Sequence, residues 1–307
     1  MSDRPLGSAA PWPAPGKLNL FLHVVGRRPD GYYELQTAFQ FIDLCDRITF
    51  FERPPGVVER LDPLPGVAAA DDLVVRAASL LAAHAGGRGA PVPGVAIGLD
   101  KRLPVGGGVG GGSSDAATVL VALNELWGLG LDAPRLAELG LALGADVPVF
   151  VHGRAAWAEG VGERLVAQDF PQPLYVLVRP DAAVSTAEVF KAPELTRDSP
   201  ITTIAGFLQD GGRNDCEPVV RRRHPAVAEA LDWLGRFGPA RLTGTGSCVF
   251  APMDDAASAG RVLAQLPARW QGWVAHALNR SPLLERLRQE RAARRPAGGE
   301  HRREGTG

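Results

Sequence analysis

Apolar stretches of strand length recur along the first half of the chain, each ended by glycine, proline or charged residues. Residues 18–25 and 37–51 are apolar and rich in aromatic or β-branched side chains, and 95–99 is a third such stretch. Runs of this length and composition are typical of buried strands. The pattern therefore predicts strands at these three positions, with a polar turn at 26–31 after the first.

Helical patterns fill the gaps between these strands. The two aspartates at 71–72 are good helix caps and predict a helix through residue 81. Residues 116–127 are apolar on nearly every face, which predicts a buried helix. Asp132 caps a further predicted helix, and glycine and proline break the pattern within 144–148.

The second half predicts shorter elements. Strands are expected at 147–151, 155–158 and 174–178, helices at 226–237 and 256–266, and a glycine turn leading into a strand at 241–251. We expect a first lobe at residues 1–165 and a second at 166–290, with the option that the last helix packs on the first lobe. Residues 291–307 are almost free of apolar side chains, which predicts a disordered tail.

Composition and charge exclude several classes of protein. With 307 residues, 45% of them hydrophobic and 22% charged, the chain is long enough for two lobes that share a cleft. The formal net charge of −1 provides no overall basic field for nucleic acid or an anionic membrane. Three scattered cysteines without a CxxC pair, and no apolar run of signal-peptide or membrane-span length, predict a cytoplasmic protein.

The strongest chemical signal is the glycine-rich run PVGGGVGGGSS at 104–114, between a predicted strand and a predicted helix. Glycine lets backbone N–H groups approach a ligand, and a helix N-terminus adds unpaired N–H groups and a positive dipole end. The predicted phosphate-binding residues are Pro104, Val105, Gly106, Gly107, Gly108, Val109, Gly110, Gly111, Gly112, Ser113 and Ser114. A mobile linker is the disfavoured alternative, because linkers are not normally locked between apolar elements.

Two common nucleotide motifs fit this run poorly. A Walker A loop needs a lysine directly after its glycines, and none is there. Gly106, Gly108 and Gly111 satisfy GxGxxG, but the acidic residue expected about 20 positions later falls in a turn, where Asp132 is better explained as a helix cap. A dinucleotide-dependent oxidoreductase is therefore the runner-up hypothesis, and a binding protein without chemistry is a third.

Phosphoryl transfer also requires positive charge and often a carboxylate that accepts the proton of the acceptor hydroxyl. Lys17, at the start of the first predicted strand, and Asp146, in the break before Pro148, are the candidates. Taken alone, each residue is more simply explained as a surface charge or a turn residue.

Four motifs together identify a family. PAPGKLNLFLHV at 13–24, LPVGGGVGGGSSDAA at 103–117, LGADVPVF at 143–150 and LTGTGSCVF at 242–250 resemble the GHMP kinases, in order and over nearly the whole chain. The resemblance implies a two-lobed α+β fold, with an ATP-binding lobe and a substrate-binding lobe, and Mg²⁺ as the companion of ATP. DGYYELQT at 30–37 favours cytidine diphosphate methylerythritol, of isoprenoid biosynthesis, as substrate over homoserine, mevalonate or a sugar.

The resemblance also implies roles for single residues. The glycine run would wrap the ATP phosphates, Asp146 would accept the proton, and Lys17 would keep Asp146 ionised and orient the hydroxyl. Substrate-binding roles fall on Asn19, Tyr32, Tyr33, Thr186, Gly244, Thr245 and Gly246. The tyrosine at 33 stands where the family usually has histidine. Recognition of cytosine could be rearranged there, or the side chain could be neutral.

The sequence marks no acidic ligand set for magnesium. Glu159 and Glu163 are conceivable ligands, but a role in a turn is the favoured interpretation. Arg221–Arg223 are interpreted as a solvated helix face rather than a nucleic-acid site. A monomer and a homodimer are both compatible with the sequence.

Overall fold

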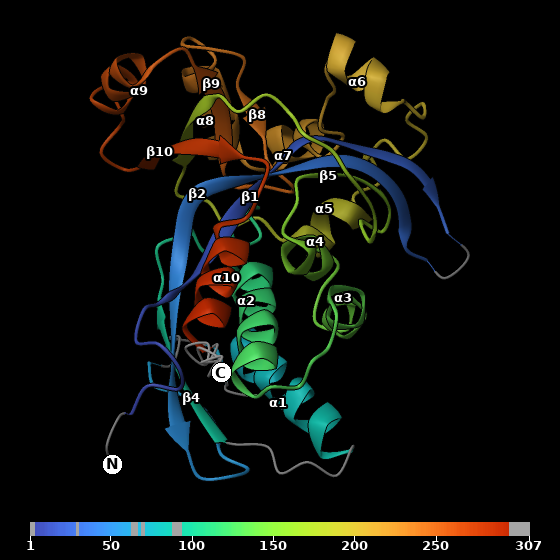
Figure 1. Cartoon of the computed structure of the whole chain (residues 1–307). Helices are drawn as coiled ribbons and strands as arrows, with labels where there is room; N and C mark the ends of the chain where they lie inside the picture. The colour runs from blue at the N-terminus through green and yellow to red at the C-terminus, as the bar shows by residue number, and fades with distance from the viewer. Residues whose placement is uncertain (1–3, 29–30, 63–66, 69–70, 88–93, 295–307) are drawn as a thin grey trace, which may run out of the picture.

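A computed structural model describes residues 4–28, 31–62, 67–68, 71–87 and 94–294. Its centre is a long antiparallel hairpin of β1 (Trp12–Arg27) and β2 (Tyr33–Arg53), which runs through the whole molecule in Figure 1. β2 also pairs with β4 (Gly94–Asp100), β5 (Ala156–Gly160) and β10 (Gln271–Leu278). Within the described residues, ten strands thereby join into one sheet. The strands predicted at 18–25, 37–51 and 95–99 lie inside β1, β2 and β4.

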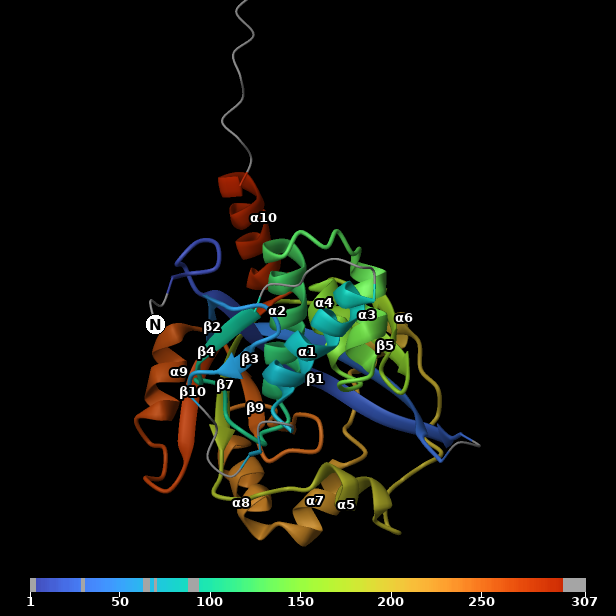
Figure 2. The same cartoon turned by 90° about the horizontal axis from the view of Figure 1, so that it is seen from below.

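Helices cover one face of the first part of the sheet, as the view from below shows (Figure 2). A buried cluster that includes Phe41, Ile48 and Leu120 packs between them. α2 is buried on almost all sides, as the pattern at 116–127 predicts, although it begins at the glycine run. The elements here are β3 (Val58–Arg60), α1 (Leu73–Gly86), α2 (Gly111–Leu126), α3 (Ala133–Leu141), α4 (Val147–His152) and β6 (Arg164–Ala167).

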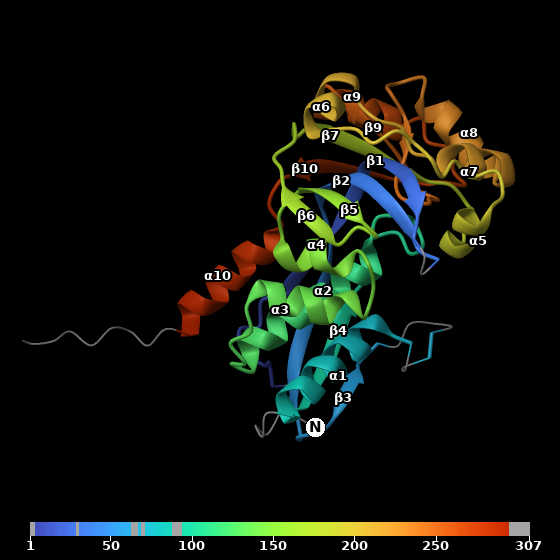
Figure 3. The same ribbon diagram turned by 90° about the vertical axis from the view of Figure 1, so that its right-hand side faces the viewer.

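The second part of the sheet continues from β10 through β7, β9 and β8, and carries its own helices at the opposite end of the molecule from α1 (Figure 3). A second buried cluster, which includes Val176, Leu231 and Val249, also takes in Leu22 and Val24 from β1. The elements are β7 (Leu174–Arg179), α5 (Thr186–Lys191), α6 (Ile204–Asp210), α7 (Glu217–Arg223), α8 (Pro225–Leu234), β8 (Arg241–Leu242), β9 (Val249–Met253) and α9 (Ala256–Leu263).

The chain then returns to the first cluster. α10 (Pro282–Arg294) packs against β1 and α2, and Leu283 is fully buried there. The predicted tail beginning at 291 is wrong for its first residues, because Arg291 and Arg294 are helical and bond to Glu125. Residues 295–307 lie outside the described part of the chain. No described helix combines the length and apolarity of a membrane span.

One predicted element has the wrong type. Residues 147–151, predicted as a strand, form α4, with Pro148 in its first turn and all five residues buried. A short apolar run fits a buried strand and a buried helix equally, because periodicity cannot separate them. β3, β6, β10 and α5–α7 are not among the predicted elements, and the last helix is predicted without bounds. The helix at 226–237 is predicted about three residues too long, since α8 ends at Leu234.

Candidate active site

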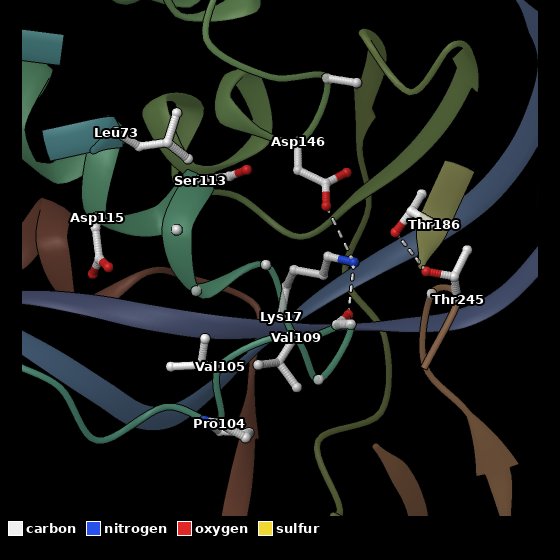
Figure 4. Close-up of a pocket in the computed structure, with 18 of the residues that line it drawn as sticks. Lys17, Leu73, Pro104, Val105, Val109, Ser113, Asp115, Asp146, Thr186 and Thr245 are labelled. Carbon is white, nitrogen blue, oxygen red and sulfur yellow. Dashed lines mark hydrogen bonds and ion pairs between the residues drawn. The ribbon is translucent and has the colours of Figure 1, made fainter. Parts of the chain in front are cut away.

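One cavity of ≈ 590 Å³ lies where β1, the glycine run, the start of α4 and the turn after β8 meet. Most of the predicted site residues line it, including Asn19. Figure 4 shows Lys17, Asp146 and Thr186 around it. Its lining residues are Lys17, Asn19, Leu22, Leu35, Thr37, Phe39, Arg60, Val67, Asp71, Asp72, Leu73, Val74, Leu99, Lys101, 104–113, Asp115, Ala145, Asp146, Val161, Gly162, Thr186, Phe190, Gly244 and Thr245.

The glycine run wraps one end of this cavity. Gly106, Gly108 and Gly110 have φ of +69°, +75° and +71°, a left-handed conformation that favours glycine. A Cβ at Gly108 would lie 2.2 Å from the carbonyl oxygen of Thr243, so the loop is also packed tightly against the turn after β8.

α2 begins directly behind this loop. Gly110 is its N-cap. The N–H groups of Gly111, Gly112 and Ser113 in the first turn have no partner inside the helix, and the glycine cap has no side chain that could accept from them. Ser114 differs from the prediction: its N–H bonds to Gly110 O and its side chain is buried outside the cavity. An anion beside the glycine run would therefore meet three helix N–H groups and the positive end of the helix dipole.

Lys17 and Asp146 form an ion pair inside the cavity. Lys17 Nζ lies 3.3 Å from Asp146 Oδ2, and the side chains are 4% and 33% exposed, respectively. The same ammonium donates to Gly108 O at 3.1 Å and to Asn19 Oδ1. Figure 4 shows the lysine between the carboxylate and the glycine run. The buried cation is thus fixed in position, while the carboxylate stays open to a ligand.

Asn19 connects this pair to both halves of the molecule. Its side-chain nitrogen donates to Thr37 Oγ1 at 2.9 Å, and its backbone N–H donates to Thr243 Oγ1 at 3.1 Å. Thr243 Oγ1 in turn donates to Gly108 O at 3.2 Å. The carbonyl of Gly108 therefore receives hydrogen bonds from Lys17 and from the turn after β8, and both hold the glycine run in place.

Two threonine hydroxyls meet in the same cavity as Lys17 and Asp146. Thr186 Oγ1 and Thr245 Oγ1 lie 2.8 Å apart, which joins the start of α5 to the turn after β8 (Figure 4). Asn214 Nδ2 holds that turn by donating to Gly244 O at 2.7 Å. Gly246 belongs to the same turn but does not line the cavity, and its N–H bonds to Thr243 O.

Besides Gly246, the structure keeps two predicted substrate residues, both tyrosines, off the cavity. Tyr32 is 66% exposed, and neither Tyr32 nor Tyr33 lines the cavity. Tyr33 instead stacks on Phe190, with ring centroids 5.6 Å apart and planes 20° apart. Phe190 does line the cavity, so an aromatic wall is present but comes from a residue that sequence reasoning missed. Asp30 of the DGYYELQT motif lies outside the described residues.

Sequence reasoning also missed a buried charged cluster beside the glycine run. Lys101 Nζ lies 2.5 Å from Asp46 Oδ2 and 2.7 Å from Asp115 Oδ2. Burial, opposed by Lys101 and reinforced by Asp46, raises the pKa of the Asp115 carboxyl to about 8. A Cβ on Gly111 would lie 3.1 Å from Lys101 Nζ, so a cation sits at the first turn of α2. Sequence reasoning looks for a lysine after the glycines, as in a Walker A loop. Lys101 precedes them, so that search does not find it.

The conceivable magnesium ligands lie elsewhere. Glu159 accepts hydrogen bonds from Gln36 and Trp157, Glu163 accepts one from the backbone of Val161, and neither glutamate lines the cavity. Among the described residues, no three His, Cys, Asp or Glu side chains gather as a metal cage. The arginines at 221–223 lie at the end of α7, where two of them pair with acidic side chains.

Known proteins resemble the chain in sequence and in structure. Residues 72–154 match the family GHMP kinases N terminal domain, and residues 196–272 match GHMP kinases C terminal. The 4-diphosphocytidyl-2-C-methyl-D-erythritol kinase of Nitrosococcus oceani is 58% identical, covering 90% of this chain and 97% of its own. The protein of that name from Halorhodospira halophila is 61% identical, covering 89% of this chain and 94% of its own.

Solved structures agree with these relatives. A crystal structure of 4-(cytidine 5'-diphospho)-2C-methyl-D-erythritol kinase matches with a TM-score of 0.75 and 35% identity, covering 86% of this chain and 98% of that one. The mevalonate kinase of Methanococcus jannaschii matches with a TM-score of 0.64 but only 16% identity, which indicates a shared fold alone. The oxidoreductase hypothesis is thereby overturned, and the predicted α+β kinase fold is confirmed.

Proposed function

The chain belongs to the GHMP kinases and, among them, to the 4-diphosphocytidyl-2-C-methyl-D-erythritol kinases, and on that premise we propose its reaction. It transfers the γ-phosphoryl group of ATP to the 2-hydroxyl of cytidine diphosphate methylerythritol, a step of isoprenoid biosynthesis. The observation that carries the proposal is the Lys17–Asp146 ion pair of 3.3 Å, which faces the glycine run across one cavity.

The glycine run and the first turn of α2 hold the triphosphate. Residues 105–113 present backbone N–H groups and the helix dipole to the phosphates, which suits an anion without needing a side-chain cation at each oxygen. Lys101 adds positive charge at that end of the cavity. The apolar side chains of Leu73, Leu99 and Val105 line the cavity nearby and offer surface to the adenine ring.

Asp146 receives the proton of the acceptor hydroxyl as the oxygen–phosphorus bond forms. Its partial exposure inside the cavity lets a hydroxyl reach it, and Lys17 pairs with it at 3.3 Å. Lys17 also stabilises the negative charge that spreads over the transferring group. Asn19 fixes the lysine, so the pair keeps its geometry before substrate arrives.

The acceptor lies between this pair and the hydroxyls of Thr186 and Thr245. Both hydroxyls and the backbone around Gly244 offer hydrogen bonds to the polyol and diphosphate. The predicted contact of Tyr32 with cytosine stays a prediction, since its side chain lies off the cavity.

Magnesium does not fit a protein cage here, because no three acidic or histidine side chains gather among the described residues. We propose that Mg²⁺ enters with ATP and that phosphate oxygens and water would supply most of its ligands. We place the enzyme in the cytoplasm, where its three free thiols stay reduced. A monomer or homodimer remains the expected state, which sedimentation of the purified chain tests.

Turnover of the purified chain tests the proposal. With ATP, Mg²⁺ and cytidine diphosphate methylerythritol, we expect one ADP formed for each phosphorylated product, identified by mass and by phosphorus NMR. Homoserine, mevalonate and galactose serve as comparison acceptors. Turnover of one of these acceptors without turnover of the cytidyl substrate would refute the assignment.

A further inference from the structure

Arg197 uses all of its guanidinium N–H groups within one small region. Nη2 donates to the carbonyls of Phe190 at 3.1 Å and Ala192 at 2.6 Å, and Nη1 donates to those of Leu195 at 2.9 Å and Pro193 at 3.4 Å. These carbonyls lie at and just beyond the C-terminus of α5, where helix carbonyls lack partners and a positive charge is favourable.

The fifth N–H of the guanidinium reaches another element. Arg197 Nε donates to Tyr33 Oη at 3.2 Å, and its guanidinium lies 5.5 Å from the Tyr33 ring centroid. Tyr33 is the first residue of β2, and its ring stacks on Phe190. Tyr33 and Arg197 therefore contact both Phe190 and each other, and together they join α5 to the β1–β2 hairpin.

α5 carries two cavity-lining residues on one face. Thr186 and Phe190 are four residues apart, which places them one above the other on a helix, and both line the cavity. With six residues, α5 is too short to be stable alone, so contacts outside the helix fix its position. Arg197 and Tyr33 supply those contacts at its C-terminal end, while the Thr186–Thr245 hydroxyl pair supplies one at its start.

We propose that Arg197 and Tyr33 are positioning residues for the acceptor end of the cavity. They hold Phe190 and Thr186 in place from behind, without touching the acceptor. The Tyr33 hydroxyl is engaged by Arg197 and not by the base, so tyrosine at this position supports the aromatic wall instead of reading cytosine directly. The identity of the acceptor rests on the proposed function, whereas the bracing of α5 does not.

The proposal is tested by Arg197→Lys, Tyr33→Phe and Tyr33→Ala. Lysine keeps the charge but loses the planar fork that reaches five acceptors. We expect Arg197→Lys to raise the acceptor KM roughly ten-fold, with kcat and the ATP KM changed less than about two-fold. Tyr33→Phe keeps the stack and should have a smaller effect than Tyr33→Ala, and it should add nothing in the Arg197→Lys background. Arg269→Lys, at an exposed ion pair with Glu229, is the matched control.

Hydrogen exchange gives a readout that needs no turnover. In Arg197→Lys, amide exchange in peptides covering 186–195 should accelerate, while peptides covering 104–126 should keep their wild-type rates. Unchanged exchange in 186–195 would overturn the proposal, and so would an ATP KM that rises as much as the acceptor KM. Equal effects of Tyr33→Phe and Tyr33→Ala would also overturn it, because the stack of the Tyr33 ring on Phe190 would then contribute nothing to the position of α5. If the wild-type protein does not turn over the cytidyl substrate, but amide exchange in 186–195 is still faster in Arg197→Lys, the proposed function would be refuted and the bracing of α5 supported.

Discussion

The chemistry of the site depends on a few side chains whose significance comes from where they meet. Lys17 and Asp146 are each ambiguous in isolation, and their motifs, rather than their residue types, predict that they act together. The structure brings them to 3.3 Å and buries the cation rather than the carboxylate. This asymmetry supports the proposed role of Asp146 as a base, because the group that would accept a proton is the one that substrate can reach.

Replacing Asp146 with asparagine tests this asymmetry. The amide keeps a similar size but cannot accept the proton, so kcat should fall by roughly 10²- to 10⁴-fold while the ATP KM changes little. Steady-state kinetics with each substrate varied measures both. Asp169→Asn, at an exposed ion pair with Arg154, should leave both constants unchanged. Normal turnover by Asp146→Asn would show that another group takes the proton.

Asp115 gives the protein a pH-dependent stability. Its folded pKa of about 8 lies far above the ordinary value of about 3.9 in an unfolded chain. Between these values the folded protein keeps a proton that the unfolded chain releases. The stabilisation is therefore complete below about pH 4 and is lost progressively as the pH rises toward 8.

Asp115→Asn removes this dependence. Urea unfolding of both proteins at several pH values between about 5 and 8 should give a flatter profile for the variant. The difference in unfolding free energy between Asp115→Asn and the wild type should therefore shift in favour of the variant as the pH rises. Parallel profiles would mean that Asp115 is ionised in the folded state, with Lys101 compensating two carboxylates at once.

Sequence reasoning finds the residues that lie within motifs and misses those that approach from elsewhere. The glycine run predicts an anion site because its conformation is encoded locally. Lys101, Phe190 and Arg197 carry no such signal, since each acquires its position only when distant strands and helices pack together. Tyr33 shows the limit most clearly: its motif predicts contact with substrate, but its ring packs behind Phe190.

At the scale of elements, the glycine run behaves as a rigid part of the fold rather than as a flexible loop. Its left-handed glycines, its contact with Thr243 and its continuation into α2 fix its path at both ends. Its conformation can therefore be predicted from its own residues, whereas the surface that it packs against cannot. That surface is formed by the turn after β8, more than a hundred residues later in the chain.

Two glycine substitutions separate backbone strain from packing. Gly106→Ala and Gly108→Ala both place a side chain at positive φ, at a cost of about 1–2 kcal/mol each. Only the alanine at 108 would also meet Thr243 O, whereas a Cβ at 106 has nothing within 4 Å. We expect Gly108→Ala to lower stability further and to raise the ATP KM, while Gly106→Ala shows mainly the strain. Calorimetry and ATP titration measure the two effects, and identical behaviour would contradict tight packing at 108.

At the scale of the whole molecule, one hairpin belongs to both buried clusters. The tip of the hairpin, with Leu22 and Val24, packs in the cluster with β7–β9, and the part toward its open end, with Trp12 and Ile48, packs in the cluster with α1 and α2. The composition predicts two lobes around a cleft but not this sharing, because pairing between strands far apart in sequence leaves no local pattern. The sequence allows a last helix to return to the first cluster, but it does not predict where that helix begins and ends.

Leu283→Ala tests how far α10 supports the rest of the molecule. Leu283 is fully buried against the first cluster, so its truncation should cost about 2–5 kcal/mol of unfolding free energy. Urea unfolding followed by circular dichroism measures the change. Leu141→Ala, at a side chain that is 40% exposed, should cost far less. Equal losses would indicate that α10 is only loosely attached.

The path of the chain between the two clusters also limits how such enzymes can be recombined. A gene segment that encodes β7 to α9 looks like a cassette that one relative could donate to another. Its interior, however, is completed by Leu22, Val24 and Leu35 of the hairpin, which the gene encodes far upstream. A chimera made with a single exchange would leave a mismatched interior, and transplanting acceptor preference therefore requires the hairpin tip and the cassette to be exchanged together.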